Sequence, residues 1–197
     1  MAKTDLRVIK TKRAIKTAFN QLIVKKPVNK ITITELTQLA LINKGTFYLH
    51  YPDIYALYDE VLAEFAQQSA ANSTAYPLLF THSRTFVREF LFGDTPTPTA
   101  DQLALLKPEN SRFATDFPQV LLAAFKQAIY AVGKLTPNQT NDIKLDFLLN
   151  GMIGLLVKPA LLNADDPACV EFTVQFVSRM IEQALPEFYP TKKVASD

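Results

Sequence analysis

Apolar residues recur every three or four positions along most of the chain, which is the period of an α-helix that buries one face. The clearest run follows the spacing i, i+3, i+4, i+7, i+8 and i+11, at Ile54, Leu57, Tyr58, Val61, Leu62 and Phe65. A first helix is predicted over about 5–25, with one stripe formed by Val8, Ile15, Phe19, Leu22 and Ile23. Glycine is scarce and no Asn-Gly or Asp-Gly hairpin signal occurs. We therefore expect an all-α fold.

Two short helices are predicted before the long one. Thr32 begins the first, over 32–41, as a capping box in which its hydroxyl accepts from a helical amide and Glu35 reaches back to the Thr32 amide. Asn43 caps the second, over 43–50. Together they have the length of two helices joined by a tight turn.

Further helices are predicted beyond residue 72. Their approximate ranges are 76–92, 100–107, 117–134, 138–160 and 167–185. They would form a helical body that follows the N-terminal helices.

The last two predicted helices favour association with another molecule. Asp166 and Pro167 form an N-cap and first position of a helix whose stripe contains Val170, Val174, Val177, Ile181 and Ala184. The helix before it is apolar over most of its circumference, and Gly151 and Gly154 allow close helix approach. A four-helix bundle with a second copy is one interpretation. Burial of both helices within one subunit is equally compatible with the periodicity.

Charge divides the chain at Tyr51. Residues 1–51 carry ten Lys and Arg against two acids, a net +8, and the remainder carries eleven against seventeen, a net −6. A basic segment attracts nucleic acid by releasing condensed counterions, while an acidic body discourages binding elsewhere. Charge alone is also compatible with solvated helix faces that bind nothing.

The second short helix has the composition of a recognition helix in the DNA major groove. Lys44 and Thr46 are the candidates for base edges, and Tyr48 and His50 for phosphates. Gly45 permits close approach of backbone and DNA. We therefore expect double-stranded DNA as a partner.

Two aromatic residues of the same segment are expected to point inward. Phe47 and Tyr51 would fasten the helix to a small core. The alternative is a three-helix core without any ligand, in which this aromatic pair simply packs.

The stretch over 31–51, Ile-Thr-Ile-Thr-Glu-Leu-Thr-Gln-Leu-Ala-Leu-Ile-Asn-Lys-Gly-Thr-Phe-Tyr-Leu-His-Tyr, resembles the DNA-binding head of the tetracycline-repressor family, also called TetR/AcrR. The specific part is Lys-Gly-Thr-Phe-Tyr-Leu-His-Tyr at 44–51. The resemblance covers roughly residues 7–65. The body is similar to the family only in being helical and of suitable length.

This resemblance implies a homodimer whose two heads enter successive major grooves of a palindromic operator and repress a nearby gene until a small molecule binds the body. It assigns DNA contacts to Thr34, Lys44, Gly45, Thr46, Tyr48 and His50. Two positions depart from the family pattern. Ile54 stands where a phosphate-binding lysine is usual, and Leu41 replaces the turn glycine, which is unfavourable if the turn requires a positive φ.

The predicted organisation is a DNA-binding domain over 1–52, with its motif at about 32–51, and a helical effector-binding and dimerisation domain over 53–197. No arrangement of acid, base and nucleophile, phosphate loop or metal-ligand cluster is visible, so we expect no enzyme, catalytic residue, metal or cofactor. His82 and the single cysteine, Cys169, are interpreted as ordinary packed or surface residues. A charged N-terminus and the lone cysteine favour a cytoplasmic protein without a membrane segment.

Twelve of the fourteen phenylalanines lie beyond residue 51. They fit either a core or the lining of a pocket for an apolar or aromatic effector; those singled out are Phe80, Phe86, Phe90, Phe113, Phe117, Phe125 and Phe147. The leading hypothesis is a sequence-specific transcriptional regulator, in the first instance a repressor relieved by such an effector, although activation uses the same head equally well. The alternative is a helical interaction protein whose head has lost DNA recognition and binds a protein or small-molecule partner.

Overall fold

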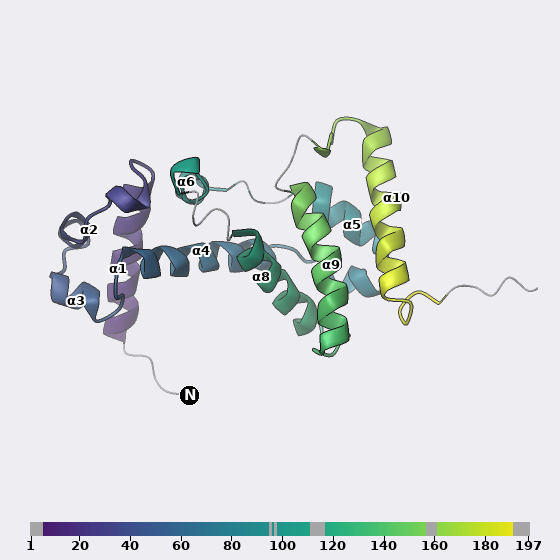
Figure 1. The fold of residues 1–197 in the computed structure, drawn as a ribbon, viewed down its shortest axis with the longest axis horizontal. Coiled ribbons are helices and arrows are strands. Elements are labelled where there is room, and N and C mark those ends of the chain that lie inside the picture. The colour runs from purple at the N-terminus through teal and green to yellow at the C-terminus, as the bar shows by residue number, and fades with distance from the viewer. Residues whose placement is uncertain (1–5, 95, 97, 111–116, 157–160, 191–197) are drawn as a thin grey trace, which may run out of the picture. The chain divides into compact units, whose positions relative to one another are not determined.

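The computed structural model describes residues 6–94, 96, 98–110, 117–156 and 161–190. Every regular element within these residues is helical, so the expected all-α fold is confirmed. The α-helices shown in Figure 1 are α1 (Leu6–Ile23), α2 (Ile33–Leu39), α3 (Lys44–Tyr48), α4 (Ile54–Ala71), α5 (Ser83–Phe92), α6 (Ala100–Leu105), α8 (Phe117–Ala131), α9 (Gln139–Leu156) and α10 (Pro167–Ala184). The 3₁₀ helices are η1 (Val28–Lys30), η2 (Tyr76–Phe80) and η3 (Pro108–Asn110).

The predicted single helix over 76–92 is wrong, because this segment forms η2 followed by α5. Thr81 and His82 leave helical backbone geometry between the two elements. Tertiary contacts hold both sides of the break: Tyr189 donates a hydrogen bond to the Leu79 carbonyl, and Ser83 donates one to Glu182. These distant partners override a helical period that is otherwise continuous.

The chain divides into two compact units. The N-terminal unit comprises the described residues within Met1–Ala66 and Thr97–Phe117, and the C-terminal unit those within Gln67–Pro96 and Pro118–Asp197. The N-terminal unit thus contains the first part of α4 and the segment of α6 and η3 in addition to α1, α2 and α3. The functional division predicted after residue 52 stays a prediction.

An apolar core holds the N-terminal unit together. Four of the five residues of the predicted α1 stripe are buried, while Val8 is 36% exposed, which corrects that member of the stripe. Val8 lies in the first turn of α1, near the end of the described chain. All six residues of the predicted α4 stripe are buried. Phe19 of α1 meets Tyr58 of α4 edge to face, with ring centroids 6.3 Å apart.

Polar side chains fasten the segment of α6 and η3 to this core. Asn110 is 2% exposed; its Oδ1 accepts from the Val28 amide at 2.9 Å and its Nδ2 donates to the Ala104 carbonyl at 3.0 Å. The hydroxyl of Tyr58 donates to the Leu105 carbonyl at 2.6 Å. Buried backbone groups that would otherwise lack partners are therefore satisfied by side chains far away in sequence.

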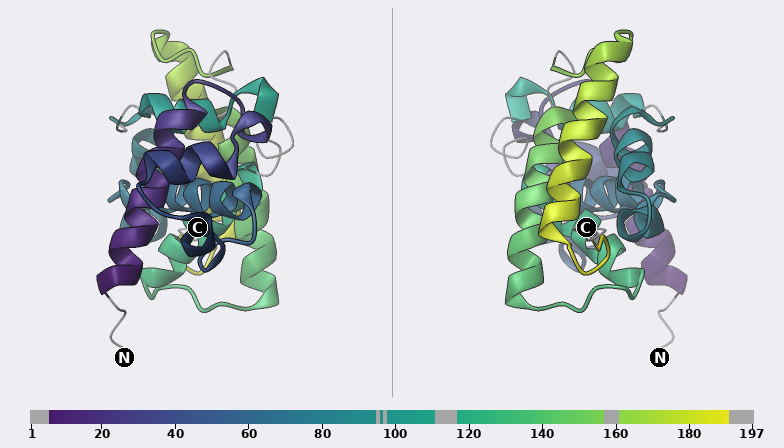
Figure 2. Two further views of the ribbon diagram at one scale, coloured as in Figure 1. Left: turned by 90° about the vertical axis from the view of Figure 1, so that its left-hand side faces the viewer. Right: turned by 90° about the vertical axis from the view of Figure 1, so that its right-hand side faces the viewer.

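The C-terminal unit is built around α5, α9 and α10, which contact one another and appear side by side in Figure 2. Lys126 of α8 joins α9 through ion pairs with Asp142 at 2.9 Å and Asp146 at 2.7 Å. The predicted cap of α10 is confirmed, since Asp166 accepts from the Ala168 amide at 2.9 Å and Pro167 occupies the first turn.

Most of the phenylalanines singled out in the sequence pack in the core. Phe80, Phe86, Phe90, Phe117 and Phe125 are all at most 7% exposed. Phe90 contacts both Phe86 and Phe125, with ring centroids 5.4 Å and 4.9 Å apart. Phe147 differs, being 71% exposed, and Phe113 lies outside the described residues.

The outward sides of α9 and α10 are unusually apolar. Ile143 and Phe147 of α9 are 64% and 71% exposed, and Phe172 and Phe176 of α10 are 68% and 54% exposed. The latter two rings stack, with centroids 6.0 Å apart. The stripe predicted for association is a different one: its members Val174, Val177 and Ile181 are buried within this unit.

Candidate nucleic-acid interface

The turn between α2 and α3 has the hydrogen bonds of a Schellman motif. The Ile42 amide donates to the Thr37 carbonyl at 3.0 Å, and the Leu41 amide to the Gln38 carbonyl at 3.2 Å. This motif requires a left-handed residue at its end, and Leu41 adopts φ 55°. A side chain with a Cβ pays about 1–2 kcal/mol for that conformation. The turn therefore keeps the geometry of a glycine turn in spite of the leucine.

The N-terminal cap of α2 is only half as predicted. Thr32 Oγ1 accepts from the Glu35 amide at 3.2 Å, which confirms the cap. The Glu35 carboxylate does not return to the Thr32 amide; it forms an ion pair with Lys26 instead. The expected capping box is therefore wrong in its second half, because a cation from the preceding segment competes for the carboxylate.

Asn43 caps α3 and also fixes the threonine expected to contact bases. Its Oδ1 accepts from the Thr46 amide at 2.7 Å and from the Thr46 hydroxyl at 2.9 Å. Since that hydroxyl already donates its proton, Thr46 retains an acceptor oxygen and a methyl group for any external partner. Sequence analysis found the cap but not this second bond.

The aromatic anchor of α3 lies inward, as predicted. Phe47 is fully buried and Tyr51 is 2% exposed, with ring centroids 5.7 Å apart. Tyr48 projects outward at 55% exposure, and its ring and that of Phe47 lie edge to face with centroids 5.5 Å apart. The anchor thus fixes which side of α3 faces solvent.

The structure brings most of the predicted contact residues together on α3 and its flanks. Lys44, Gly45 and Tyr48 are exposed, and Thr46 and His50 are partly exposed. Thr34 is exposed in the first turn of α2. A Cβ added at Gly45 would meet only Asn43 Oδ1, at 3.4 Å, so packing within the chain does not demand glycine there.

Sequence reasoning missed Leu49 as part of this surface. Leu49 is 82% exposed directly after α3. Its spacing of three and four residues from Thr46 and Gly45 was the available signal, because such residues share one side of a helix.

The start of α4 offers no cation. Asp53 caps the helix, its Oδ1 accepting from the amides of Tyr55 and Ala56 at 2.9 and 2.8 Å. Ile54 is 8% exposed and belongs to the core. The position at which the family resemblance predicts a phosphate-binding lysine is therefore a core position in this chain.

Several basic side chains of the N-terminal unit are neutralised within it. Lys12 pairs with Glu60 at 2.9 Å and lies over the Tyr51 ring, 5.1 Å from its centroid. Lys16 pairs with both Glu60 and Glu64. Burial would lower the pKa of Lys16, but hydrogen bonds and charges from the two glutamates outweigh it and raise that pKa. These lysines hold α1 to α4.

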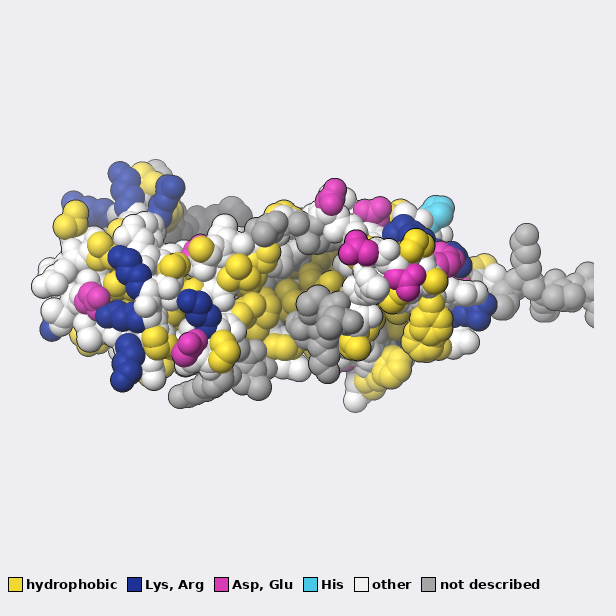
Figure 3. All heavy atoms as spheres, turned by 90° about the horizontal axis from the view of Figure 1, so that it is seen from above, with side chains coloured by type: hydrophobic (Ala, Val, Ile, Leu, Met, Phe, Trp, Pro, Cys, Tyr) yellow, Lys and Arg dark blue, Asp and Glu magenta, His cyan; other side chains and the backbone are white. Residues whose placement is uncertain are grey.

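Within residues 6–51, five other cations are exposed and form no ion pair with any described residue: Lys10, Arg13, Lys25, Lys30 and Lys44. Figure 3 shows Lys and Arg side chains spread over the part of the surface that contains α1 to α3. The surplus positive charge of residues 1–51 is therefore available to an external anion.

The chemistry-bearing residues of the C-terminal unit do not assemble into a site. His82 is exposed and Cys169 is partly exposed. Over the described ranges, no three His, Cys, Asp or Glu side chains lie close enough together to hold a metal ion. None of the helices described is both long and apolar enough to cross a membrane.

Comparisons with known proteins give one structural likeness. No family model and no curated protein matches the sequence. A solved structure from Mesorhizobium loti MAFF303099, assigned to the TetR family of transcriptional regulators, aligns over 93% of this chain and 98% of its own, at 16% identity and a TM-score of 0.47.

Proposed function

We propose that this protein is a sequence-specific, DNA-binding transcriptional regulator of the tetracycline-repressor type. The single observation that carries the proposal is the construction of α3. An inward aromatic anchor and an Asn43 cap hold a short helix with Lys44, Gly45 and Tyr48 facing solvent. The left-handed turn before it and the unpaired cations around it support the same function.

Different residues of the motif have different proposed roles. Lys44 and Thr46 meet base edges, whereas Thr34, Tyr48 and His50 fix the protein on the sugar–phosphate backbone. Because the Thr46 hydroxyl already donates to Asn43, its partner is a base-edge donor, such as the amino group of adenine or cytosine, or a thymine methyl group. Replacing Thr46 by Ala should change sequence preference, while replacing Tyr48 or His50 should weaken binding to all sequences alike.

A homodimer supplies the second head. The exposed apolar side of α9 and α10 supports this part of the proposal, as does the open space at two glycines of α9: a Cβ added at Gly151 or Gly154 meets nothing within 4 Å. Ile143, Phe147, Phe172 and Phe176 would be buried by a second copy of the same face. Two heads then address a palindromic operator.

Regulation by a small apolar or aromatic molecule completes the proposal. The C-terminal unit is rich in phenylalanine, and most of the described rings pack against one another. An effector would have to favour one of two packings of this unit and so change the affinity of the heads for DNA. A screen of aromatic compounds for a raised melting temperature and for release of bound DNA tests this step.

The rival function is an interaction protein without DNA recognition. Buried Ile54 and exposed Leu41 and Leu49 favour it, because they give the head apolar surface and no lysine at the start of α4. The two functions differ in salt dependence. Binding through phosphates weakens steeply as salt rises, whereas an apolar interface does not.

The test captures sheared genomic DNA on the full-length protein at 50, 100 and 200 mM KCl and sequences the bound fragments. The proposal predicts a small set of enriched loci, with retention falling steeply over this range. A Lys44→Gln/Thr46→Ala variant of unchanged melting temperature should lose the enrichment. Retention without enriched loci, or enrichment that survives in the variant, would reject the proposed role of α3.

A further inference from the structure

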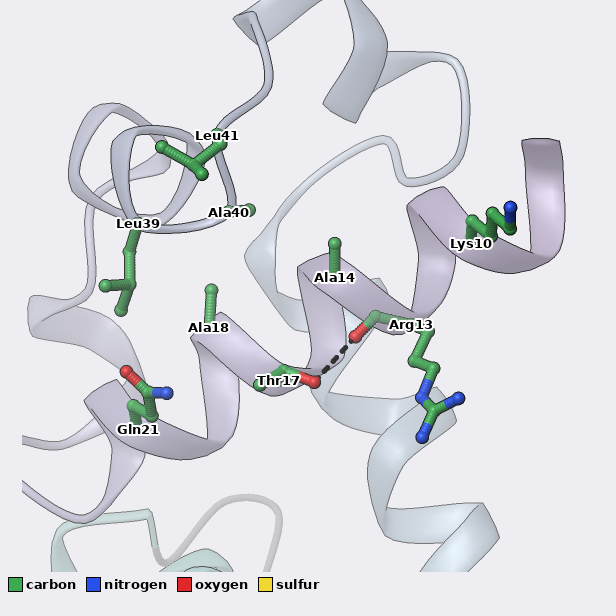
Figure 4. A pocket seen from close by; sticks show the side chains of 9 residues that line it. All are labelled: Lys10, Arg13, Ala14, Thr17, Ala18, Gln21, Leu39, Ala40 and Leu41. Carbon is green, nitrogen blue, oxygen red and sulfur yellow. Dashed lines mark hydrogen bonds between the residues drawn. The ribbon is translucent and has the colours of Figure 1, made fainter.

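An open hollow of about 420 Å³ lies between α1 and the turn that follows α2 (Figure 4). Its floor is apolar, with Ala14 and Ala18 of α1 pointing toward the turn. Its other lining residues are Lys10, Arg13, Thr17, Gln21, Leu39, Ala40 and Leu41. The hollow therefore combines an apolar floor with two cations from α1.

The cations at the hollow differ from their neighbours on the same helix. Lys12 and Lys16 are neutralised by Glu60 and Glu64. Lys10 and Arg13 are exposed and form no ion pair with any described residue. The lysines of α1 that face α4 are thus neutralised by its glutamates. The side of α1 that lines the hollow keeps two positive charges.

The side chain of Leu41 is almost fully exposed and buries little surface within the chain. Leu41 adopts φ 55° and is 92% exposed. A glycine would form the same turn without that cost. A side chain kept in an unfavourable backbone conformation and left in solvent indicates a contact outside the chain. Leu39 beside it is 44% exposed.

The lining of the hollow ends just before the proposed recognition helix in sequence. Leu41 lies two residues before Asn43, the cap of α3. When the start of α3 enters a major groove, a DNA strand that borders the groove passes beside this turn. A strand alternates anionic phosphates with apolar deoxyribose rings, which matches cations beside an apolar floor.

We propose that this hollow binds the sugar–phosphate backbone of duplex DNA, with Lys10 and Arg13 on phosphate oxygens and Leu41 against deoxyribose. The inference rests on the proposed DNA-binding function and extends the interface from α3 to α1. It adds contacts that position the head without distinguishing base sequence.

The experiment measures affinity against KCl concentration for a duplex enriched by the wild-type protein and for an unrelated duplex. Lys10→Gln/Arg13→Gln is compared with Lys134→Gln/Arg179→Gln, which removes the same charge from exposed positions of the C-terminal unit that do not line the hollow. The affinity of the first variant for both duplexes should fall roughly tenfold or more. The slope of its log affinity against log salt concentration should shrink by about 0.9 for each phosphate contact removed. The control should stay near wild type. Leu41→Ala should weaken binding a few-fold and leave the slope unchanged.

A scan with single methylphosphonate linkages locates the contact directly. Neutralising a contacted phosphate should weaken the wild-type protein and have a smaller effect on Lys10→Gln or Arg13→Gln. This scan also decides the matter if the double variant melts at a lower temperature. Equal losses in both double variants would show a general charge effect and overturn the inference.

Failure of the inference is distinguishable from failure of the proposed function. Wild-type binding to an enriched duplex with an unchanged slope in Lys10→Gln/Arg13→Gln would remove the α1 contact and leave the DNA-binding function standing. An unchanged slope together with binding of an acidic peptide that this variant loses would assign the hollow to a protein partner. Absence of any duplex binding by the wild-type protein would overturn both.

Discussion

The two compact units differ in what they do with charge and with apolar surface. In the C-terminal unit Arg84 and Arg88 pair with Glu171, Lys126 pairs with Asp142 and Asp146 of α9, and Lys144 pairs with Glu187 beyond the end of α10. In the N-terminal unit, the part within residues 6–51 alone leaves five exposed cations without an ion pair to any described residue. In the C-terminal unit Lys134 and Arg179 are exposed without a described ion pair, so unpaired cations are concentrated in the N-terminal unit but are not confined to it. Concentrated unpaired positive charge suits a polyanionic partner.

The exposed side chains repeat this difference. Lys44 and Tyr48 lie outward on α3, whereas Phe147, Phe172 and Phe176 lie outward on α9 and α10. A groove in DNA presents phosphates and hydrogen-bonding base edges, and a second copy of an apolar helix pair presents hydrocarbon. The two units are therefore suited to different partners, one for recognition and one for assembly.

The largest expected effect comes from placing a charge on the exposed side of α9. Phe147→Asp should dissociate the dimer and lower operator affinity at least about 100-fold, or about 2.7 kcal/mol, because burial of an unpaired carboxylate is costly and one head alone makes half the contacts. Sedimentation and DNA titration measure the two effects. Leu103→Asp, at a residue of α6 that is 53% exposed, is the matched control. A dimer that survives Phe147→Asp contradicts the assigned face.

The next effect concerns the stability of the N-terminal unit. Asn110→Leu should lower the free energy of unfolding by about 2 kcal/mol, because the Val28 amide and the Ala104 carbonyl lose their partners while buried. Denaturant unfolding gives the magnitude, and hydrogen exchange should show faster opening in the N-terminal unit. Asn29→Leu, at an exposed position of the same unit, should have little effect. Equal losses in the two variants would count against the Asn110 contacts.

A smaller effect of opposite sign is expected at the turn. Leu41→Gly should raise the free energy of unfolding by about 1 kcal/mol, because glycine adopts φ 55° without steric cost. Leu41→Ala keeps the Cβ and should give no such gain in stability. Thermal melts of the two variants therefore separate the cost of the left-handed backbone from the effect of removing the side chain. A gain of the same size in both would attribute the effect to the exposed side chain.

The smallest effect is in the pH dependence of stability. Burial would raise the pKa of Glu60, but hydrogen bonds and charges from Lys16 and Lys12 outweigh it and lower that pKa below 4.5. The stabilisation is therefore present above the unfolded pKa and is lost as pH falls through the folded value. As pH is lowered below about 4.5, the melting temperature of Glu60→Gln should fall less than that of the wild-type protein. Parallel curves for the two proteins would contradict this linkage.

Local sequence signals predicted much of the fold and of the candidate site. A side chain that accepts a hydrogen bond from an amide two or three residues away can be predicted from the local sequence. The caps at Thr32, Asn43 and Asp166 are of this kind. Apolar period alone located the inward faces of α4 and of the recognition segment. It also predicted that α10 has one apolar stripe, and Val174, Val177 and Ile181 of that stripe are buried within the unit.

Features that depend on distant partners were not predictable in this way. Lys12 and Lys16 meet acids up to 48 residues away, and Asn110 meets an amide 82 residues away. The Glu35 carboxylate had two competing partners, and only the packing of the preceding segment decided for Lys26. The exposure of Phe147, Phe172 and Phe176 likewise depends on which helix side the neighbours cover.

The most direct test of the central claim is selection from a randomised duplex pool by the purified full-length protein at moderate salt, repeated with Thr46→Ala. The account predicts a palindrome whose half-sites lie about one helical turn apart. It also predicts that Thr46→Ala shifts the preferred base at one position of each half-site. Selection of no common sequence, or of one that is unaffected by Thr46→Ala, would contradict DNA recognition through α3.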